Sequence, residues 1–366
     1  MKIQSAYLIV VLTVINWGFT QNPRITLKNG QQIFASGMNL AWIEFGEDLT
    51  NFDEARFTKA LDEISSAGGN AMRWWLHVDG SHSPKFTNGK VSDLNTGEIR
   101  NLKRALDLSK ERGIVVDMVL WSFDMLMKRK GVNIEDNLNL IEKPEYTQAY
   151  IDIALIPMVR TLKDHPAILC WEICNEPEGM SRKYGWTNVR TTKRYLQKFH
   201  NLIAGAIHRE APDALVCTGS WNIQVISDIG EFESWYSDEA LIAAGNDSLG
   251  ILDFYQVHYY PRWYGEDYSP FHHPASYWKT SKPILIGEFQ AYGLIDLGDG
   301  YRPKTTMTTQ EAYEYAYQNG YAGCFAWTWT GHDGFGGILD AQPGMFSLKK
   351  KYPLDIIINF GKISEN

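Results

Sequence analysis

Two glutamates stand out because each ends a short apolar run, where a charged group is costly. Glu176 lies in the run 171–177 (Trp-Glu-Ile-Cys-Asn-Glu-Pro), and Glu288 lies in the run 284–289 (Ile-Leu-Ile-Gly-Glu-Phe). A carboxylate at the end of a buried strand loses solvation, so something at that place should use it. Two such carboxylates, far apart in sequence, suggest the acid and the nucleophile of a glycosidase.

Short apolar runs alternate along the chain with segments of helical period, which predicts parallel strands joined by helices. The expected strands are residues 34–42, 71–77, 113–121, 167–175, 215–221, 254–260, 283–289 and 324–329. The expected helices include residues 57–64, 102–109, 151–162 (kinked at Pro157), 195–207 and 310–319. Eight strands in this alternation predict a single α/β domain, a closed (β/α)8 TIM barrel. Both glutamates would then lie on the barrel face where the active site is expected.

The first residues are expected to be removed. Residues 1–20 carry a positive charge at Lys2, an apolar stretch over 6–15 and small or polar residues after it, as in a secretory signal peptide. About ten apolar residues are too few to span a bilayer. We therefore expect a secreted, extracellular protein whose residues 21–366 form one catalytic domain without an attached binding module.

Composition excludes several partners. The net charge of −8 argues against nucleic acid and anionic membranes. The 13 Trp and 19 Tyr offer flat faces for stacking on sugars, although a core can also use them. No cysteine pair has metal-ligand spacing, so no zinc site is expected. The cysteines read as buried small hydrophobes, and their pairing stays open, with one bridge between neighbouring strands allowed; they are Cys170, Cys174, Cys217 and Cys324.

Several of these segments together resemble glycoside hydrolase family 5. The resemblance is carried by the runs around the two glutamates, the segment around Arg73, residues 257–260 (Val-His-Tyr-Tyr) and residues 326–329 (Ala-Trp-Thr-Trp). It covers about residues 33–330. Within that family the chain looks most like the secreted endo-β-1,4-mannanases of invertebrate animals.

The resemblance implies roles for five residues. Glu176 is implied as the general acid/base, and Asn175 before it as the group that binds the sugar 2-hydroxyl. Glu288 is implied as the nucleophile, kept ionised and aimed by Arg73 and Tyr260. An acid of this kind must stay protonated near neutral pH, which poor solvation or an anionic neighbour can achieve.

Five further residues are candidates for substrate binding. The resemblance places His258 in the site and makes Trp327 the platform under the sugar at the cleavage point. Trp329 would share a strand face with Trp327. Trp263 follows a strand and would line a further sugar site, and His77 ends the second strand. Each has a structural alternative: a hydrogen-bonded core histidine for His258 and His77, and core packing for the tryptophans.

Together these features indicate a retaining endo-β-1,4-mannanase. It should act on mannan-type β-linked polysaccharide as a monomer, without cofactor or metal. Two alternatives stay open: an endo-β-1,4-glucanase with the same catalytic residues, and a barrel that binds polysaccharide without cutting it. Residues 120–124 (Leu-Trp-Ser-Phe-Asp) lack the histidine that many cellulases of the family have there, which favours mannan. Asn246 begins an N-glycosylation sequon whose use is also left open.

Overall fold

Eight parallel strands close into a barrel in the computed structural model, which describes residues 23–295 and 306–361. The predicted signal peptide, residues 1–20, lies outside the described residues. The barrel strands follow one another in chain order, and the last pairs with the first. They are β3 (Ala35–Ala41), β4 (Ala71–Val78), β7 (Val115–Ser122), β8 (Ile168–Asn175), β9 (Val216–Ser220), β10 (Tyr255–His258), β11 (Ile284–Gln290) and β14 (Gly323–Trp327). The predicted single TIM barrel is confirmed.

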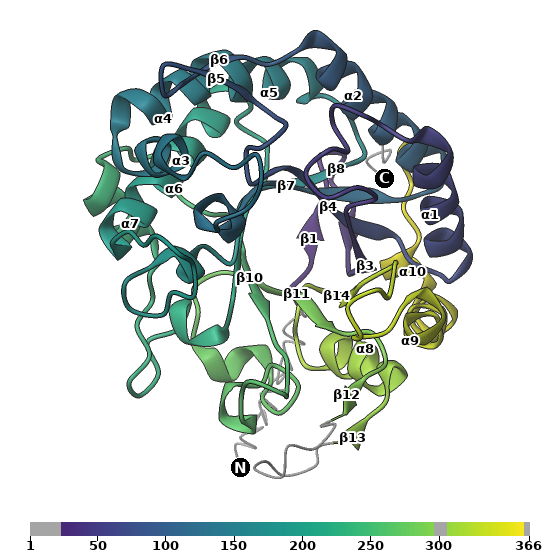
Figure 1. Ribbon diagram of the computed structural model, residues 1–366. Coiled ribbons are helices and arrows are strands. Elements are labelled where there is room, and N and C mark those ends of the chain that lie inside the picture. The colour runs from purple at the N-terminus through teal and green to yellow at the C-terminus, as the bar shows by residue number, and fades with distance from the viewer. Residues whose placement is uncertain (1–22, 296–305, 362–366) are drawn as a thin grey trace, which may run out of the picture.

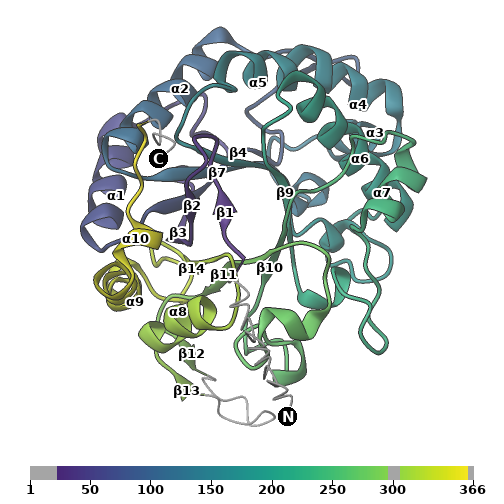
Figure 2. The same ribbon diagram turned by 180° about the vertical axis from the view of Figure 1, so that it is seen from behind.

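Helices surround the barrel in both views (Figures 1 and 2). The helix α6 (Lys193–Glu210) shows why: Leu196, Phe199 and Ile203 are buried at a spacing of three or four residues, so one face packs inward. Thr192 begins this helix, because its hydroxyl accepts a backbone N–H three residues on. The other helices are α1 (Glu54–Ser66), α2 (Thr96–Glu111), α3 (Ile134–Glu142), α4 (Pro144–Tyr150), α5 (Ile156–Leu162), α7 (Asp238–Gly245), α8 (Thr309–Gln318), α9 (Ile338–Lys351) and α10 (Pro353–Ile356).

Some element boundaries differ from the predicted ones. The sixth and eighth strands end at His258 and Trp327, so Tyr260 and Trp329 lie in loops beyond them. Ahead of Pro157 the helical ladder changes to a π-turn, η2 (Ile151–Leu155), which is the change expected near a residue without an N–H. The other short turns are η1 (Phe123–Leu126), η3 (Pro177–Met180), η4 (Ile223–Val225), η5 (Glu266–Tyr268) and η6 (Ala275–Trp278).

A small hairpin covers the end of the barrel where the strands begin. It consists of β1 (Ile25–Thr26) and β2 (Gln32–Ile33), and it lies across the middle of the ring in Figure 2. Its Ile25 and Ile33 join a buried apolar cluster with first residues of the strands, such as Ala35 and Ala71. The opposite end of the barrel is therefore the one open to a ligand. Two further antiparallel strand pairs are β5 (Lys85–Thr87) with β6 (Lys90–Asp93) and β12 (Leu294–Ile295) with β13 (Thr306–Met307).

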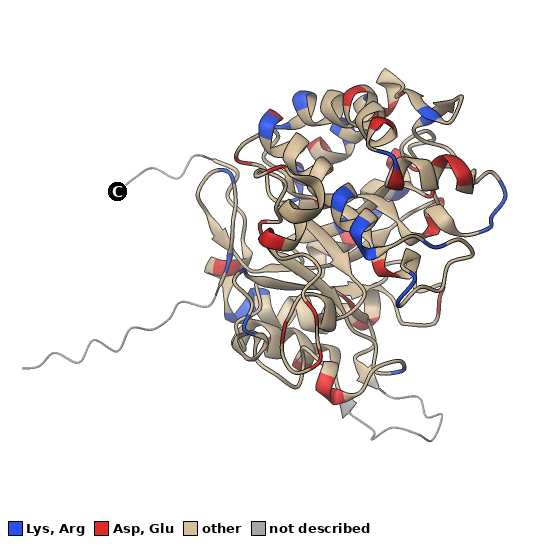
Figure 3. Cartoon of the chain, turned by 90° about the vertical axis from the view of Figure 1, so that its left-hand side faces the viewer, with Lys and Arg blue, Asp and Glu red and all other residues tan. Residues whose placement is uncertain are grey.

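Charged residues of both signs are interspersed over the outer helices and loops of the face drawn in Figure 3. This pattern agrees with a surface that has no single large field of one sign. Within residues 23–295 and 306–361, no helix combines the length and the apolar character needed to cross a membrane.

Candidate active site

Glu176 and Glu288 meet at the open end of the barrel. Glu176 directly follows β8, and its backbone N–H donates to the Gly219 carbonyl of β9 at 2.6 Å. Its φ of +45° lies in the left-handed region, where the chain turns from the strand into η3. Glu288 lies near the end of β11. A carboxylate oxygen of each residue lies within 4.8 Å of the other and of a ring nitrogen of His258. Exposed fractions are 18% for the Glu176 side chain and 6% for that of Glu288.

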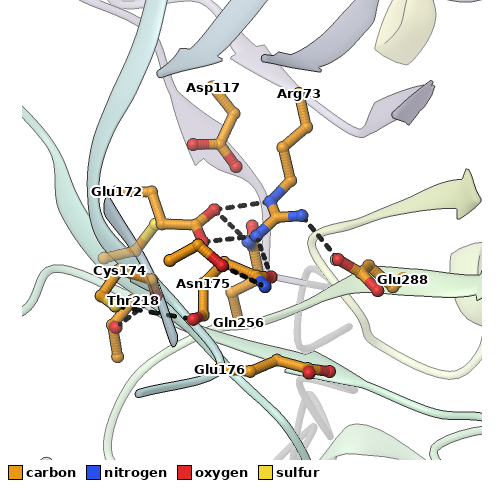
Figure 4. A network of polar contacts seen from close by, with 12 residues as sticks. Arg73, Asp117, Glu172, Cys174, Asn175, Glu176, Thr218, Gln256 and Glu288 are labelled. Carbon is orange, nitrogen blue, oxygen red and sulfur yellow. Dashed lines mark hydrogen bonds and ion pairs between the residues drawn. The ribbon is translucent and has the colours of Figure 1, made fainter. Parts of the chain in front are cut away.

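Arg73 links Glu288 to a second buried acid, Glu172. The fully buried guanidinium donates from Nε and Nη2 to both oxygens of Glu172, at 2.7 and 2.6 Å, and from Nη1 to Glu288 Oε1 at 2.7 Å. Figure 4 shows Arg73 between the two carboxylates. Nη1 also donates to Asn39 Oδ1 at 3.0 Å and Nη2 to Asn175 Oδ1 at 2.8 Å. Burial alone would lower the pKa of Arg73, but the carboxylates of Glu172 and Glu288 raise it overall.

Gly219 of β9 lies so close to the Arg73–Glu172 ion pair that a side chain at this position would clash with it. A Cβ on Gly219 would lie 2.4 Å from Glu172 Oε1 and 2.9 Å from Arg73 Nη2. Glycine at this place lets β9 approach the ion pair closely. Gln256 of β10 donates to Glu172 Oε2 at 2.5 Å. The network therefore draws on β4, β8, β9 and β10, which fixes Arg73 from several sides.

A bulge in β8 brings two of these residues to the same side. Glu172 and Asn175 are three apart, so strict alternation would point them to opposite faces. The pairing of β8 with β9 shifts register between them, and both contact Arg73. The sequence did not single out Glu172 for this network, although it is a charged residue inside the apolar run 168–174. Asn39, Gln256 and Gly219 gave no comparable signal.

Glu288 has the richer set of hydrogen-bond donors. Tyr260 donates its hydroxyl hydrogen to Oε2 at 2.7 Å, and Arg73 donates to Oε1. Burial, and secondarily Glu176, raise the pKa of Glu288 above its ordinary value, while His258, Arg73 and Tyr260 oppose that rise. Near neutral pH, where His258 is uncharged, the Arg73 and Tyr260 donors favour the ionised form, so Glu288 ionises before a buried carboxyl that lacks them.

Within the part of the chain that the structure describes, the Glu176 carboxyl group has one side-chain hydrogen-bond partner, His258. His258 Nδ1 lies 2.9 Å from its Oε1 and 3.5 Å from Glu288 Oε2. Burial raises the pKa of Glu176 to about 7. Burial also lowers the pKa of His258 to about 4, so this ring is neutral at neutral pH. The neutral ring suits either state of Glu176: it can donate from Nδ1 to the carboxylate, or accept there from the carboxylic acid.

Aromatic rings flank the two glutamates on two sides. Trp327 is 7% exposed, and its indole N–H donates to Asp333. It belongs to an apolar cluster that reaches Glu288 through the Tyr260 hydroxyl. The other members of this cluster are Ala41, Trp42, Phe45, Trp75, Val78, Val119 and Phe335. On the Glu176 side a cleft of about 430 Å³ is lined by Phe123, Glu176, Trp186, Trp221, Tyr260, Trp263 and Tyr264. Trp263 is 49% exposed there, as expected for a ring available to a ligand.

Two of the candidate residues lie elsewhere. Trp329 donates its indole N–H to Glu63 of α1 at 2.8 Å and lines a separate groove with residues of α9. It leaves the face of Trp327 because β14 ends at Trp327. His77 is fully buried against Trp121, and burial lowers its pKa to about 3. The geometry of both residues matches the structural alternatives.

The four cysteines are all buried free thiols. Cys170 and Cys217, on neighbouring strands, come within 3.7 Å at their sulfurs, and the Cys170 thiol donates to Asp117 at 3.0 Å. Burial raises the pKa of both thiols well above the ordinary value of a cysteine. They act as small core groups beneath the Arg73 network.

This site has the elements of one class of enzyme. Two carboxyl groups approach at the open end of a (β/α)8 barrel, one buried against Arg and Tyr donors and the other with a raised pKa beside an aromatic cleft. Such a pair can protonate and attack a glycosidic bond, which is the chemistry of a glycoside hydrolase.

Comparison with known proteins gives the family. The family model described as cellulase (glycosyl hydrolase family 5) matches residues 27–333, so the chain belongs to that family. Mannan endo-1,4-beta-mannosidase from Mytilus edulis is 33% identical over 331 residues, which cover 83% of this chain and 85% of the relative. The enzyme of that name from Cryptopygus antarcticus is 31% identical and covers 87% of each chain.

Solved structures agree. The X-ray structure of beta-mannanase from the blue mussel Mytilus edulis superposes with a TM-score of 0.80 at 30% identity, covering 92% of this chain and 99% of that one. The endo-1,4-beta-mannanase from Eisenia fetida gives a TM-score of 0.79 at 30% identity and covers 93% and 99%. The predicted resemblance to family 5 and to its invertebrate mannanases is confirmed.

Proposed function

We propose that this protein is a retaining endo-β-1,4-mannanase that cleaves internal bonds of mannan, glucomannan or galactomannan. The observation that carries the retaining mechanism is the approach of Glu176 and Glu288 oxygens to within 4.8 Å. Retaining enzymes hold the two carboxyl groups about 5–5.5 Å apart, whereas inverting enzymes leave about 6.5–9.5 Å for a water. The mannanase relatives support the choice of substrate.

In the first step the Glu288 carboxylate attacks the anomeric carbon. The bond to the glycosidic oxygen breaks, and Glu176 gives its proton to that oxygen, which leaves with the departing sugar. Arg73 and Tyr260 hold the two oxygens of Glu288, so the attacking group is ionised and cannot rotate freely. The product of this step is a glycosyl ester on Glu288.

In the second step water attacks the same carbon. Glu176, now a carboxylate, takes a proton from this water while the bond to Glu288 breaks. The raised pKa of about 7 suits a group that must alternate between acid and base near neutral pH. The cycle needs neither cofactor nor metal, since the two carboxyl groups supply acid, nucleophile and base.

Substrate binding is assigned to residues around this pair. Asn175 is proposed to bind the sugar 2-hydroxyl, since Arg73 fixes its amide at 2.8 Å. Trp327 is proposed as the platform under the sugar at the cleavage point. Trp263 and His258 complete the binding set, while Trp329 and His77 are left out because of their positions.

We also propose that residues 1–20 are a signal peptide, that 21–366 are the mature catalytic domain, and that the mature enzyme works outside the cell as a monomer. Mass spectrometry of exported protein should give an N-terminus near Gln21. Retention of Met1 in exported protein would contradict the proposed cleavage.

Reducing-end assays test the substrate and the main alternative. Purified protein should release reducing ends from galactomannan and glucomannan much faster than from carboxymethylcellulose. The family model carries the description cellulase, so an endo-β-1,4-glucanase is the second candidate, and preference for carboxymethylcellulose would establish it. Glu176→Gln and Glu288→Gln should each lose activity by several orders of magnitude, of order 4 kcal/mol or more in barrier, while staying folded. If the unmodified protein cleaves none of the three polymers, the remaining alternative is a barrel that binds polysaccharide without cutting it.

A further inference from the structure

Another buried carboxyl group, that of Glu178, lies two residues after Glu176. Glu178 is on η3 and has no exposed surface. One of its oxygens accepts the hydroxyl hydrogen of Tyr236 at 2.5 Å, and the other accepts the backbone N–H of Trp221 at 3.1 Å. Tyr236 is itself fully buried. Both oxygens are therefore committed to protein donors, and the proposed two-step reaction makes no use of this group.

The Trp221 amide held by Glu178 belongs to the aromatic cleft. Trp221 directly follows β9, and its ring lines the cleft together with Glu176. Its ring centroid lies 5.9 Å from that of Trp186 and 5.2 Å from that of Tyr264. The hydrogen bond from this loop to Glu178 thus fixes an aromatic wall relative to the acid two residues away.

Gly179, the next residue of η3, makes room for the indole ring of Trp186, which also lines the cleft. A Cβ on Gly179 would lie 2.5 Å from two ring atoms of Trp186, so this indole lies directly against the Gly179 backbone. The Trp186 backbone N–H donates to the Gly179 carbonyl at 2.9 Å. The short segment 176–179 therefore carries the acid and supports both Trp186 and Trp221.

The cleft lies on a definite side of the cleaved bond. The acid must face the glycosidic oxygen, which departs with the sugar on the reducing side. Glu176 lines the cleft, whereas the cluster around Trp327 shares with the cleft the residue Tyr260, which donates to Glu288. The sugars of the leaving group are therefore expected along the face of the cleft that Trp186 and Trp221 form.

We propose that Glu178 is a positioning residue that holds Trp221 against the leaving-group sugars and so sets where they lie relative to Glu176. The proposal rests on the proposed function, because this side is the leaving-group side only if Glu176 is the acid. Glu178 itself does not contact substrate; it acts through the Trp221 amide.

The isosteric variant Glu178→Gln tests this role. If the amide NH2 of the glutamine faces the Trp221 N–H, a donor opposes a donor. If it faces Tyr236, whose hydroxyl can turn to accept, the Trp221 N–H keeps only a neutral amide oxygen in place of a carboxylate, which is a weaker acceptor. Two substrates should be compared: mannohexaose, which places sugars on the leaving side, and 4-nitrophenyl β-mannobioside, which does not. We expect kcat/KM for mannohexaose to fall by about tenfold or more, while kcat/KM for the nitrophenyl substrate stays within about twofold.

Three further variants make the result decisive. Trp221→Ala should give the same split between substrates, and adding Glu178→Gln to it should cost little more, because both act on one contact. Tyr236→Phe removes one donor and keeps the carboxylate, so it should give a smaller split in the same direction, which covers the case in which Glu178→Gln folds poorly. Glu98→Gln is the matched control, a buried carboxyl on α2 that accepts a hydroxyl from Ser83 at 2.7 Å, and it should change neither substrate.

Two outcomes would overturn the proposal: equal losses on both substrates in Glu178→Gln and Tyr236→Phe, or no loss on either. Full activity of Glu176→Gln on mannohexaose would instead overturn the proposed function. The two failures are thus read from different variants.

Discussion

Arg73 and Glu172 form a fully buried bidentate ion pair, with nitrogen–oxygen distances of 2.7 and 2.6 Å. The pair uses Nε and Nη2 and leaves Nη1 to donate to Glu288. Glu172 thus sets the plane of the guanidinium, and the guanidinium in turn presents one hydrogen to the proposed nucleophile. A planar group with donors in fixed directions is required for this arrangement.

Arg73→Lys should therefore lower kcat by at least about a hundredfold, even though it keeps the positive charge. A lysine amine cannot hold Glu172 with two parallel bonds and also reach Glu288. The measurement is kcat for mannohexaose with the purified, folded variant. The matched control is Arg104→Lys on α2, whose ion pair with Glu54 is exposed and should not affect kcat. If Arg73→Lys has a kcat near that of the unmodified enzyme, the guanidinium of Arg73 is not needed to orient Glu288.

The pH dependence of kcat/KM should follow the two glutamates. Glu176 must be protonated to start the reaction, so activity should fall as pH rises through its pKa of about 7. Glu288 must be ionised, and its raised pKa places the acid limb above glutamate's ordinary 4.5. Steady-state rates across the pH range measure both limbs.

Glu178 also has a pKa raised to about 7, by burial first, so it needs to be separated from Glu176. Glu178→Gln should keep the alkaline limb in the same place on mannohexaose, whose departing sugar must take a proton from the acid. Movement of that limb in Glu178→Gln, or a flat profile well beyond pH 7, would count against Glu176 as the acid.

The raised pKa of Glu176 also predicts a change in stability. Folding favours its protonated form, so the ionised form costs stability as pH rises from 4.5 through about 7. Glu176→Gln carries no charge at any pH and avoids this cost, which the pKa difference puts at up to about 3 kcal/mol. The variant should unfold at a higher temperature than the unmodified protein at pH 8, with little difference at pH 4. Equal midpoints at both pH values would mean that Glu176 is well solvated.

Trp327 and Trp329 should differ despite lying two apart. Trp327→Ala removes the proposed sugar platform and should reduce kcat/KM by about tenfold or more. Trp329→Ala removes the bond to Glu63 and packing against the apolar core, so it should lower the melting temperature and leave the kinetics of the folded enzyme unchanged. A kinetic loss in Trp329→Ala equal to that in Trp327→Ala would restore the predicted shared face.

Comparison of these two residues shows what the sequence could predict. Alternating apolar runs were enough for eight barrel strands, and the glutamates were visible because a charge at the end of such a run is conspicuous. The end of β14 at Trp327 left no mark in the apolar pattern, so alternation was continued two residues too far. The bulge in β8 also left no mark in the sequence. Strict alternation places Glu172 and Asn175 on opposite faces, whereas in the structure both contact Arg73.

Loop residues were harder to assign. Trp186 and Tyr264 lie in connections after β8 and β10, and no periodicity ties such residues to the cleft they line. His77 was ambiguous for a different reason: a strand end can point a side chain into the site or under a neighbouring loop. Packing against Trp121 decides that question, and packing is a property of the folded chain.

The anomeric form of the first product distinguishes a double displacement through Glu288 from a single displacement by water. Two inversions at the anomeric carbon restore its configuration, so proton NMR in the first seconds of mannohexaose hydrolysis should show the β-anomer before mutarotation adds the α-anomer. Initial appearance of the α-anomer would contradict the account, because it would require water to attack in a single step.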